Sequence, residues 1–110
     1  MKCVFCEIAR GESPAKIIYQ DDKVVAFDDL FPKTPQHKLI IPRKHIATLN
    51  DITEEDQGLL EHMLLTAKKL AANLGIAEKG YRVTFNCNPD GGQVIYHLHL
   101  HLMGGKALYW

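Results

Sequence analysis

Three histidines alternate with leucines in the run HLHLHLM, residues 97–103. Successive side chains of a β-strand point to opposite faces. The run therefore predicts His97, His99 and His101 in a row on one face, with the leucines in the core on the other. Imidazole titrates near neutrality and is the side chain that proteins most often use for acid–base, nucleophilic and metal chemistry. The row therefore indicates a functional site rather than an ordinary half-exposed strand.

Two kinds of chemistry fit such a row. Imidazoles at alternate strand positions can hold zinc and leave one coordination position for water. A neutral imidazole can instead attack phosphorus, form a covalent phosphohistidine and be released by water. The preceding loop, Asp90-Gly91-Gly92-Gln93, favours phosphorus, because backbone N–H groups at glycines can approach an anion closely. A Gly-Gly pair by itself is more often a simple turn.

The chain has three cysteines, and two of them, Cys3 and Cys6, have C-x-x-C spacing. This is half of a tetrahedral zinc site, which needs two further ligands. An unmetallated thiol pair or a redox motif has the same spacing, but no βαβ pattern surrounds it as in a redox domain. An odd number of cysteines argues against a disulfide framework. Cys87 is expected to be a small packed residue.

Short strands and one long helix are expected to position these residues, in an α+β arrangement. Residues 3–10 predict a short N-terminal helix that ends before Gly11 and Pro14. Apolar, β-branched and aromatic runs predict five strands in a mostly antiparallel sheet, over residues 16–19, 24–28, 38–41, 81–85 and 94–103. A four-residue turn, 20–23, is expected to join the first two strands.

The long helix is predicted between Thr53, its expected N-cap, and Gly75, its expected C′ residue. Apolar residues recur at steps of three and four and predict one buried face, formed by Leu60, Met63, Leu64, Ala67, Leu70, Ala71 and Leu74. Leu59 widens this stripe in a way that is compatible with a dimer contact.

Length and charge restrict the class of protein. A chain of 110 residues can form one domain, 1–110, with a core that needs no disulfides. Basic and acidic residues number 13 each, so no broad basic surface is expected to bind nucleic acid. No apolar run has the length of a signal peptide or a membrane span, which predicts a cytoplasmic protein without membrane association. A phosphate-bearing ligand would need a local site.

The run HLHLHLM matches the motif His-φ-His-φ-His-φ-φ, in which φ is apolar, at every position. Through this motif and the segments 13–46 and 80–105, the chain resembles the histidine triad (HIT) nucleotide-binding proteins, and among them the branch of small nucleoside phosphoramidases. The resemblance implies a HIT-like fold and a homodimer in which the two sheets join and the long helices pair. It also implies a hydrolase that cleaves nucleoside 5′-phosphoramidates or related AMP and GMP conjugates.

The resemblance further implies a role for individual residues. His99 would attack the α-phosphorus and become nucleotidylated, His101 would contact the phosphate, and His37 would help to orient the nucleophile. Asp29 would hold the ribose hydroxyls. The apolar base pocket would comprise Phe5, Ile8, Phe27 and Leu30. The phosphate and leaving-group side would comprise Asn86, Gln93 and the backbone around Val94.

Members that resemble this chain bind zinc through the same cysteine pair and two histidines. The resemblance therefore implies a structural zinc on Cys3, Cys6, His45 and His97, which pins the N-terminal segment to the sheet. In that case His97 is not free to bind phosphate, and catalysis depends on His99 and His101. No organic cofactor is expected.

The chain departs from the pattern of the animal phosphoramidases at Val94, where they carry a serine that can assist the leaving nitrogen. This departure leaves open a nucleotide-binding or scaffold protein with low turnover. A dinucleoside polyphosphate hydrolase is a further alternative. Trp110 lies where the family's C-terminal tail reaches the partner's active site, and it can equally fill the dimer interface.

Overall fold

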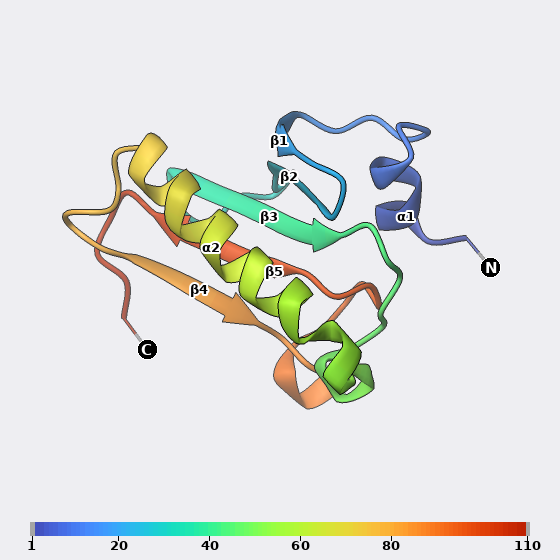
Figure 1. Ribbon diagram of the computed structural model, residues 1–110. Coiled ribbons are helices and arrows are strands. Elements are labelled where there is room, and N and C mark those ends of the chain that lie inside the picture. The colour runs from blue at the N-terminus through green and yellow to red at the C-terminus, as the bar shows by residue number, and fades with distance from the viewer. Residues whose placement is uncertain (1, 110) are drawn as a thin grey trace.

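Five strands form one antiparallel sheet in the computed structural model, which describes residues 2–109 (Figure 1). The strands are β1 (Ile17–Gln20), β2 (Val24–Asp28), β3 (Gln36–Pro42), β4 (Tyr81–Phe85) and β5 (Leu100–Gly104). Their order across the sheet is β1-β2-β3-β5-β4. Helices α1 (Val4–Ala9) and α2 (Gln57–Asn73) accompany the sheet. The predicted α+β fold, with one long helix and one short N-terminal helix, is confirmed.

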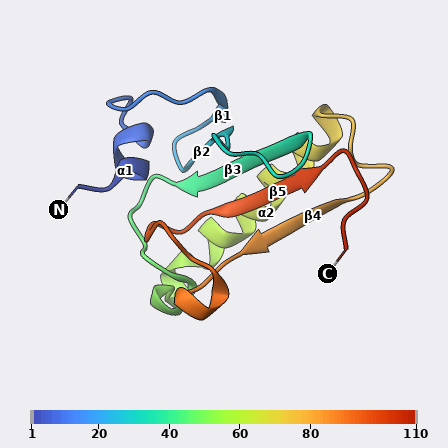
Figure 2. The ribbon, with the colours of Figure 1, turned by 180° about the vertical axis from the view of Figure 1, so that it is seen from behind.

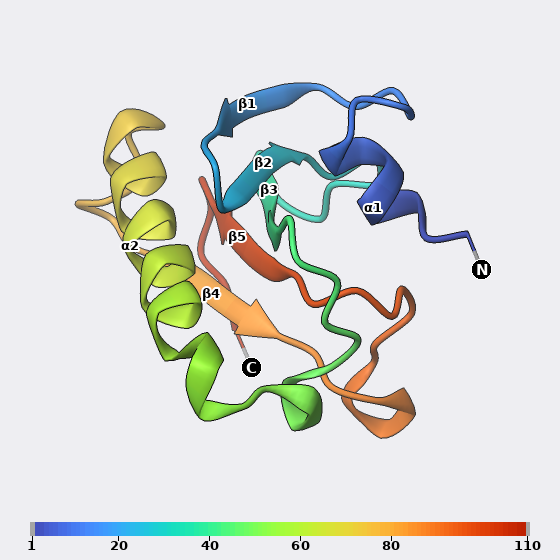
Figure 3. The ribbon, with the colours of Figure 1, turned by 45° about the vertical axis from the view of Figure 1, so that its right-hand side comes forward.

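The alternating side chains of the strands form two apolar clusters, one on each face of the sheet. The cluster under α2 includes all three leucines of the histidine run, Leu98, Leu100 and Leu102. The cluster under α1 includes Phe27 and Leu39. Figure 3 shows α2 and α1 on opposite sides of the sheet, and Figure 2 shows the face that α2 leaves open. The histidines therefore belong to the face that carries α1.

The long helix starts later than predicted, because residues Glu54–Asp56 form a separate 3-10 turn. Thr53 caps that turn through a reciprocal capping box with Asp56. At the other end Gly75 has φ +76° and forms the predicted C′ turn, in which Ile76 N–H bonds to the carbonyl of Ala71. In the described part of the chain no helix, α2 included, is both long enough and apolar enough to cross a bilayer.

The predicted buried face of α2 is correct at its centre and wrong at one position. Met63, Ala67, Leu70 and Ala71 are buried against the sheet. Leu64, by contrast, is 48% exposed. Thr66 is buried instead, because its hydroxyl donates to the carbonyl of His62 one turn earlier and needs no partner in the core.

The last strand is shorter than the predicted 94–103, since β5 begins only at Leu100. Its ladder with β3 ends where Ile40 pairs with Leu100. Before that point the N–H of Leu98 donates to the carbonyl of Ile46, outside the sheet. His97 and His99 therefore precede the strand, although the alternation of buried leucines and histidines continues through them. The predicted strands 24–28 and 81–85 coincide with β2 and β4, and 16–19 and 38–41 differ from β1 and β3 only at their ends.

The β1–β2 turn is organised by the carboxylate of Asp21. Its oxygens accept hydrogen bonds from the Tyr19 hydroxyl at 2.7 Å, the N–H groups of Lys23 and Val24 at 2.8 and 2.9 Å, and His62 Nε2 at 2.7 Å. Burial alone would raise the pKa of this carboxyl, but the four donors outweigh burial and hold it well below its usual value of 3.8.

We expect Asp21→Asn to destabilise the protein by about 2 kcal/mol at pH 7, because hydrogen bonds to a charged group are lost. Since the folded-state pKa is depressed, this contribution is fully present above about pH 4 and is lost as the pH falls through the unfolded value towards the folded one. Urea unfolding of both proteins at pH 7 and at a pH below 3.8 measures the difference. Asp22→Asn, at the exposed neighbouring position, is the control. A difference that does not shrink in acid would contradict this assignment.

Candidate active site and metal cluster

A cleft of about 700 Å³ opens on the face of the sheet that carries α1. Its walls come from α1 and the segment after it, from strands β2, β3, β4 and β5, and from the loops after β2 and β4. It contains most of the residues that the sequence assigned to substrate and catalysis, namely Phe5, Ile8, Phe27, Asp29, Leu30, His37, Asn86, Val94, His99 and His101. The fold thus brings together residues from four separate stretches of the chain.

His99 lies in the cleft with one ring nitrogen fixed. Its Nδ1 is 2.7 Å from the carbonyl oxygen of His97, and because a carbonyl can only accept, Nδ1 carries the proton. Burial lowers the pKa of His99, which favours the neutral ring at pH 7. A neutral ring protonated at Nδ1 has its lone pair on Nε2. His99 therefore offers an unprotonated nitrogen, as a nucleophile requires.

His101 and His37 are joined by a hydrogen bond beside His99. The N–H of Lys33 donates to His37 Nδ1 at 3.1 Å, so the neutral His37 ring carries its proton on Nε2. That nitrogen lies 3.0 Å from His101 Nδ1 and 3.3 Å from Asp29 Oδ2. His101 Nδ1 consequently accepts, and the proton of the neutral His101 ring is on Nε2. Burial, with His99 and His37 nearby, lowers the pKa of His101 to about 4, in keeping with a neutral ring.

Asp29 is held at the edge of the cleft by its own loop. Its Oδ1 accepts the N–H of Phe31 at 2.8 Å, while Oδ2 faces His37. A carboxylate has about four acceptor positions, so these two contacts leave capacity for hydroxyl groups. Next to it, Leu30 is 84% exposed and Phe27 is buried. Leu30 is thus an exposed part of the cleft rim, whereas Phe5, Ile8 and Phe27 form a buried apolar floor.

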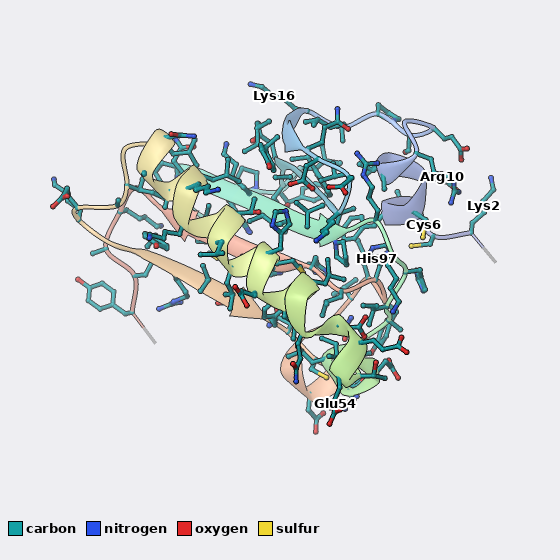
Figure 4. The ribbon with its side chains drawn as sticks, in the orientation of Figure 1. Lys2, Cys6, Arg10, Lys16, Glu54 and His97 are labelled. Atoms are coloured by element: carbon teal, nitrogen blue, oxygen red, sulfur yellow. The ribbon has the colours of Figure 1, made fainter. Side chains whose placement is uncertain are left out.

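A second cluster, separate from the cleft, joins the N-terminal cysteines to two histidines. One ligand atom from each of Cys3, Cys6, His45 and His97 lies within 4.8 Å of the others. His97 Nδ1 is 3.4 Å from Cys3 Sγ, 3.5 Å from Cys6 Sγ and 3.2 Å from His45 Nδ1. Figure 4 labels Cys6 on α1 and His97 beside it. The fold thus brings together the four residues that the family resemblance implied as zinc ligands.

The chemistry of these donors fits zinc. His97 Nε2 donates to the carbonyl of Pro42 at 2.8 Å, so the lone pair of His97 is on Nδ1, which faces the sulfurs. Burial and the neighbouring Cys3 raise the pKa of the Cys6 thiol, which disfavours a free thiolate unless a cation is present. Two sulfurs and two imidazole nitrogens are a common tetrahedral zinc set. When bound, zinc would supply a structural cross-link between α1 and the residues before β5.

Two expectations, on Gln93 and on the Gly91-Gly92 pair, find no support in the geometry. Gln93 does not line the cleft, because its side chain accepts from the N–H of Asn88 and donates to the carbonyls of Ala47 and Ile95. The N–H groups of Gly91 and Gly92 bond to carbonyls of their own loop, so the glycines serve the turn rather than a phosphate cradle. At Gly92, φ is +82°, which glycine adopts without strain. Trp110 lies outside the described residues.

The cleft also contains residues that were not among the predicted site residues. They are Val4, Ser13, Pro14, Ala15, Asp28, Phe31, Lys33, Leu39, Arg82, Thr84, Ile95 and Met103. The period of two in a strand could have identified some of them, since Leu39 follows His37 on one face of β3 and Met103 follows His101 on β5. Phe31 and Lys33 lie in a loop and carry no such signal.

Several known proteins are similar to this chain in sequence and in fold. A family model described as "Scavenger mRNA decapping enzyme C-term binding" matches residues 2–108. The chain is 49% identical over 105 residues to the purine nucleoside phosphoramidase of Escherichia coli strain K12, with 96% of this chain and 88% of that protein covered. A HIT family hydrolase from Legionella pneumophila is 51% identical and superposes with a TM-score of 0.98 over 99% of this chain and 97% of that one.

A zinc-bound histidine triad family protein from Mycobacterium smegmatis has 30% identity and a TM-score of 0.82, over 96% of this chain and 76% of that one. These matches extend over nearly the whole chain, which includes the histidine row, and two histidines of that row, His99 and His101, line the cleft. The chain therefore belongs to the histidine triad family.

Proposed function

We propose that the protein is a purine nucleotide hydrolase that cleaves nucleoside 5′-phosphoramidates through a nucleotidyl-histidine intermediate on His99. One observation carries the proposal: the ring of His99 is fixed through Nδ1–H, so that Nε2 is the free nucleophilic nitrogen of the cleft. Family membership and the activity named for the Escherichia coli relative support the reaction class.

In the proposed reaction His99 Nε2 attacks the α-phosphorus and the bond from phosphorus to the amine nitrogen breaks. The amine leaves after taking up a proton. Water then attacks the phosphorus, the bond to Nε2 breaks, and the nucleoside monophosphate is released while His99 regains its neutral form. His101, with its proton on Nε2, can donate a hydrogen bond to a phosphate oxygen in both steps. His37 Nε2, which donates to His101 Nδ1, keeps His101 in that tautomer.

The binding of the nucleoside follows from the same cleft. Phe5, Ile8 and Phe27 offer an apolar surface for a purine, and Asp29 offers carboxylate oxygens to the ribose hydroxyls. Leu30 would become covered when the base binds, which accounts for an exposed leucine at the rim. This arrangement supports AMP or GMP conjugates as the substrate class.

The direct test compares the rates at which the wild-type protein releases AMP from two different substrates. An AMP phosphoramidate of a simple alkylamine and a diadenosine tetraphosphate are incubated separately, and AMP release is followed by chromatography. Preferential release from the phosphoramidate supports the proposal. Preferential cleavage of the tetraphosphate favours the dinucleoside polyphosphate hydrolase, and tight AMP binding without turnover of either favours a binding protein.

Val94 is expected to limit the rate of this reaction. It is 85% exposed in the cleft and has no side-chain donor for the leaving nitrogen. One added hydrogen bond of about 1 kcal/mol corresponds to about a fivefold gain in kcat, so Val94→Ser should be faster than wild type by about that factor. Val94→Ala, which shortens the side chain without adding a hydroxyl, is the control. Equal gains in both variants would show that space, not the hydroxyl, matters.

We propose further that two copies of the chain associate through the β4 edge of the sheet. Among the described residues 2–109, strand β4 pairs with β5 alone. Its Tyr81 and Val83 are exposed, as are Leu64 and Leu65 of α2. An apolar edge strand of this kind is usually covered by a partner. Sedimentation equilibrium is expected to give twice the chain mass, and Val83→Lys should shift the protein towards the monomer. A monomeric wild-type protein at micromolar concentration would refute the proposal.

A further inference from the structure

His97 belongs to the metal cluster and also contacts the nucleophile. Its side chain directs Nδ1 towards Cys3, Cys6 and His45, while its backbone carbonyl accepts the proton of His99 Nδ1 at 2.7 Å. His97 is fully buried, and its Nε2 is held by the carbonyl of Pro42. If the His97 side chain moves within the cluster, the His97 backbone is therefore expected to move with it. The carbonyl of that backbone sets the orientation of the His99 ring.

Phe5 provides a second link between the cluster and the nucleophile. It lies between Cys3 and Cys6 in the sequence and is buried. Its ring meets that of His99 edge to face, with 5.2 Å between centroids and 85° between planes, and it meets the ring of His97 at 6.0 Å and 74°. The same side chain lines the cleft. The two cysteines thus flank the residue that packs directly against His99.

Helix α1, which carries Phe5 and Cys6, has six residues and is too short to be stable without contacts to the rest of the protein. At its end the carbonyl of Ala9 accepts from the guanidinium of Arg43 at 2.6 Å. At its start Cys3 accepts from the N–H of Cys6, and both sulfurs belong to the cluster. Apolar packing of Phe5 and Ile8 against the sheet holds the body of α1, whereas the cluster holds the residue before α1, Cys3, and the first turn at Cys6.

We infer that the cluster of Cys3, Cys6, His45 and His97 positions the nucleophile, so that loss of its metal releases the ring of His99 and opens the α1 wall of the cleft in a protein that is still folded. Phe5 is a positioning residue that packs against the His99 ring. His97 links the cluster to that ring through its backbone carbonyl, which accepts from His99 Nδ1. The consequence for catalysis rests on the proposed function, whereas the link between the cluster and the ring of His99 does not.

The experiment compares zinc-loaded, chelator-treated and zinc-restored full-length protein at a temperature at which circular dichroism shows all three to be folded. Long-range proton–nitrogen NMR spectra of the histidine rings report the tautomer of His99. We expect protonated Nδ1 and unprotonated Nε2 in the loaded protein, averaged signals after chelation, and recovery with zinc. If chelation leaves about one tenth of the protein in the conformation that binds AMP, the apparent Kd for AMP rises about tenfold.

Phe5→Leu provides a test that does not depend on chelation. It keeps all four ligands, so its zinc content should equal that of the wild type, yet it removes the edge-to-face contact with His99. We expect the His99 ring signals to shift in the same direction as after chelation, and kcat to fall more than KM rises. Cys87→Ser, which removes a thiol outside the cluster and the cleft, is the matched control.

The outcomes separate this inference from the proposed function. Unchanged His99 ring signals and unchanged AMP affinity in folded, metal-free protein overturn the inference, as does a protein that takes up no zinc. If chelation unfolds the protein, Phe5→Leu decides: altered ring signals at full zinc content support the inference, and unaltered signals overturn it. A loaded protein that binds no AMP but whose His99 signals respond to chelation refutes the proposed function and supports the inference.

Discussion

Replacement of His99 by alanine is expected to lower phosphoramidate hydrolysis by at least about 1,000-fold, because removal of a covalent nucleophile eliminates the reaction path rather than weakening a contact. AMP affinity should change far less, since Phe5, Ile8, Phe27 and Asp29 remain in the cleft. The measurement is kcat under saturating AMP phosphoramidate, with Kd for AMP determined separately by calorimetry.

His62→Gln is the matched control for this variant. His62 lies on α2, on the opposite side of the sheet from the cleft, and its ring nitrogen Nε2 lies 2.7 Å from the carboxylate of Asp21. It should retain wild-type kcat although it loses some stability. A His99→Ala protein that retains more than about a tenth of wild-type kcat would contradict the nucleophile assignment, because a lost nucleophile costs several orders of magnitude.

Replacement of both Cys3 and Cys6 by serine is expected to abolish zinc binding and to destabilise the protein by about 4 kcal/mol. A ligand present at about 1,000 times its Kd stabilises the folded state by that amount. Zinc is measured by elemental analysis of protein purified without a histidine tag, and stability by urea unfolding. Wild-type protein should contain about one zinc per chain, since one set of four ligands is present.

Cys87→Ser controls for the loss of a thiol and should keep both zinc and stability. The pH dependence of metal loss is a further check, because zinc must compete with protons for two thiolates and two imidazoles and is released as the pH falls. Wild-type protein that contains only traces of zinc, or whose urea midpoint does not respond to a chelator, would contradict the metal assignment.

The sequence predicted those parts of the fold that depend on local pattern. The alternation in HLHLHLM correctly placed the leucines in the core, because burial on alternate sides persists even before β5 begins. The start of β5 could not be predicted, since it depends on where Leu98 finds a backbone partner in Ile46. The exposure of Leu64 likewise depends on the rotation of α2 against the sheet, which a hydrophobic stripe defines only approximately.

The site residues likewise comprise some that form sequence motifs and some whose positions depend on the fold. The histidine row and the cysteine pair were visible as motifs. His45, 39 positions from Cys6, was named only through the family resemblance, because no local pattern links the two residues and the fold is needed to bring them together. Gln93 was expected at the phosphate side and instead holds the loop, because its amide finds three backbone partners there. Lys33 and Phe31 enter the cleft through a loop whose path no periodicity specifies.

The most direct measurement of the central claim is the mass of the protein during turnover. Wild-type protein mixed with excess AMP phosphoramidate and quenched with base within the first turnovers should carry one added adenylyl group, mapped to His99 by fragmentation. His99→Ala should carry none. An adenylyl group on another residue, or rapid AMP release by the wild type with no adduct at any time, would contradict the account.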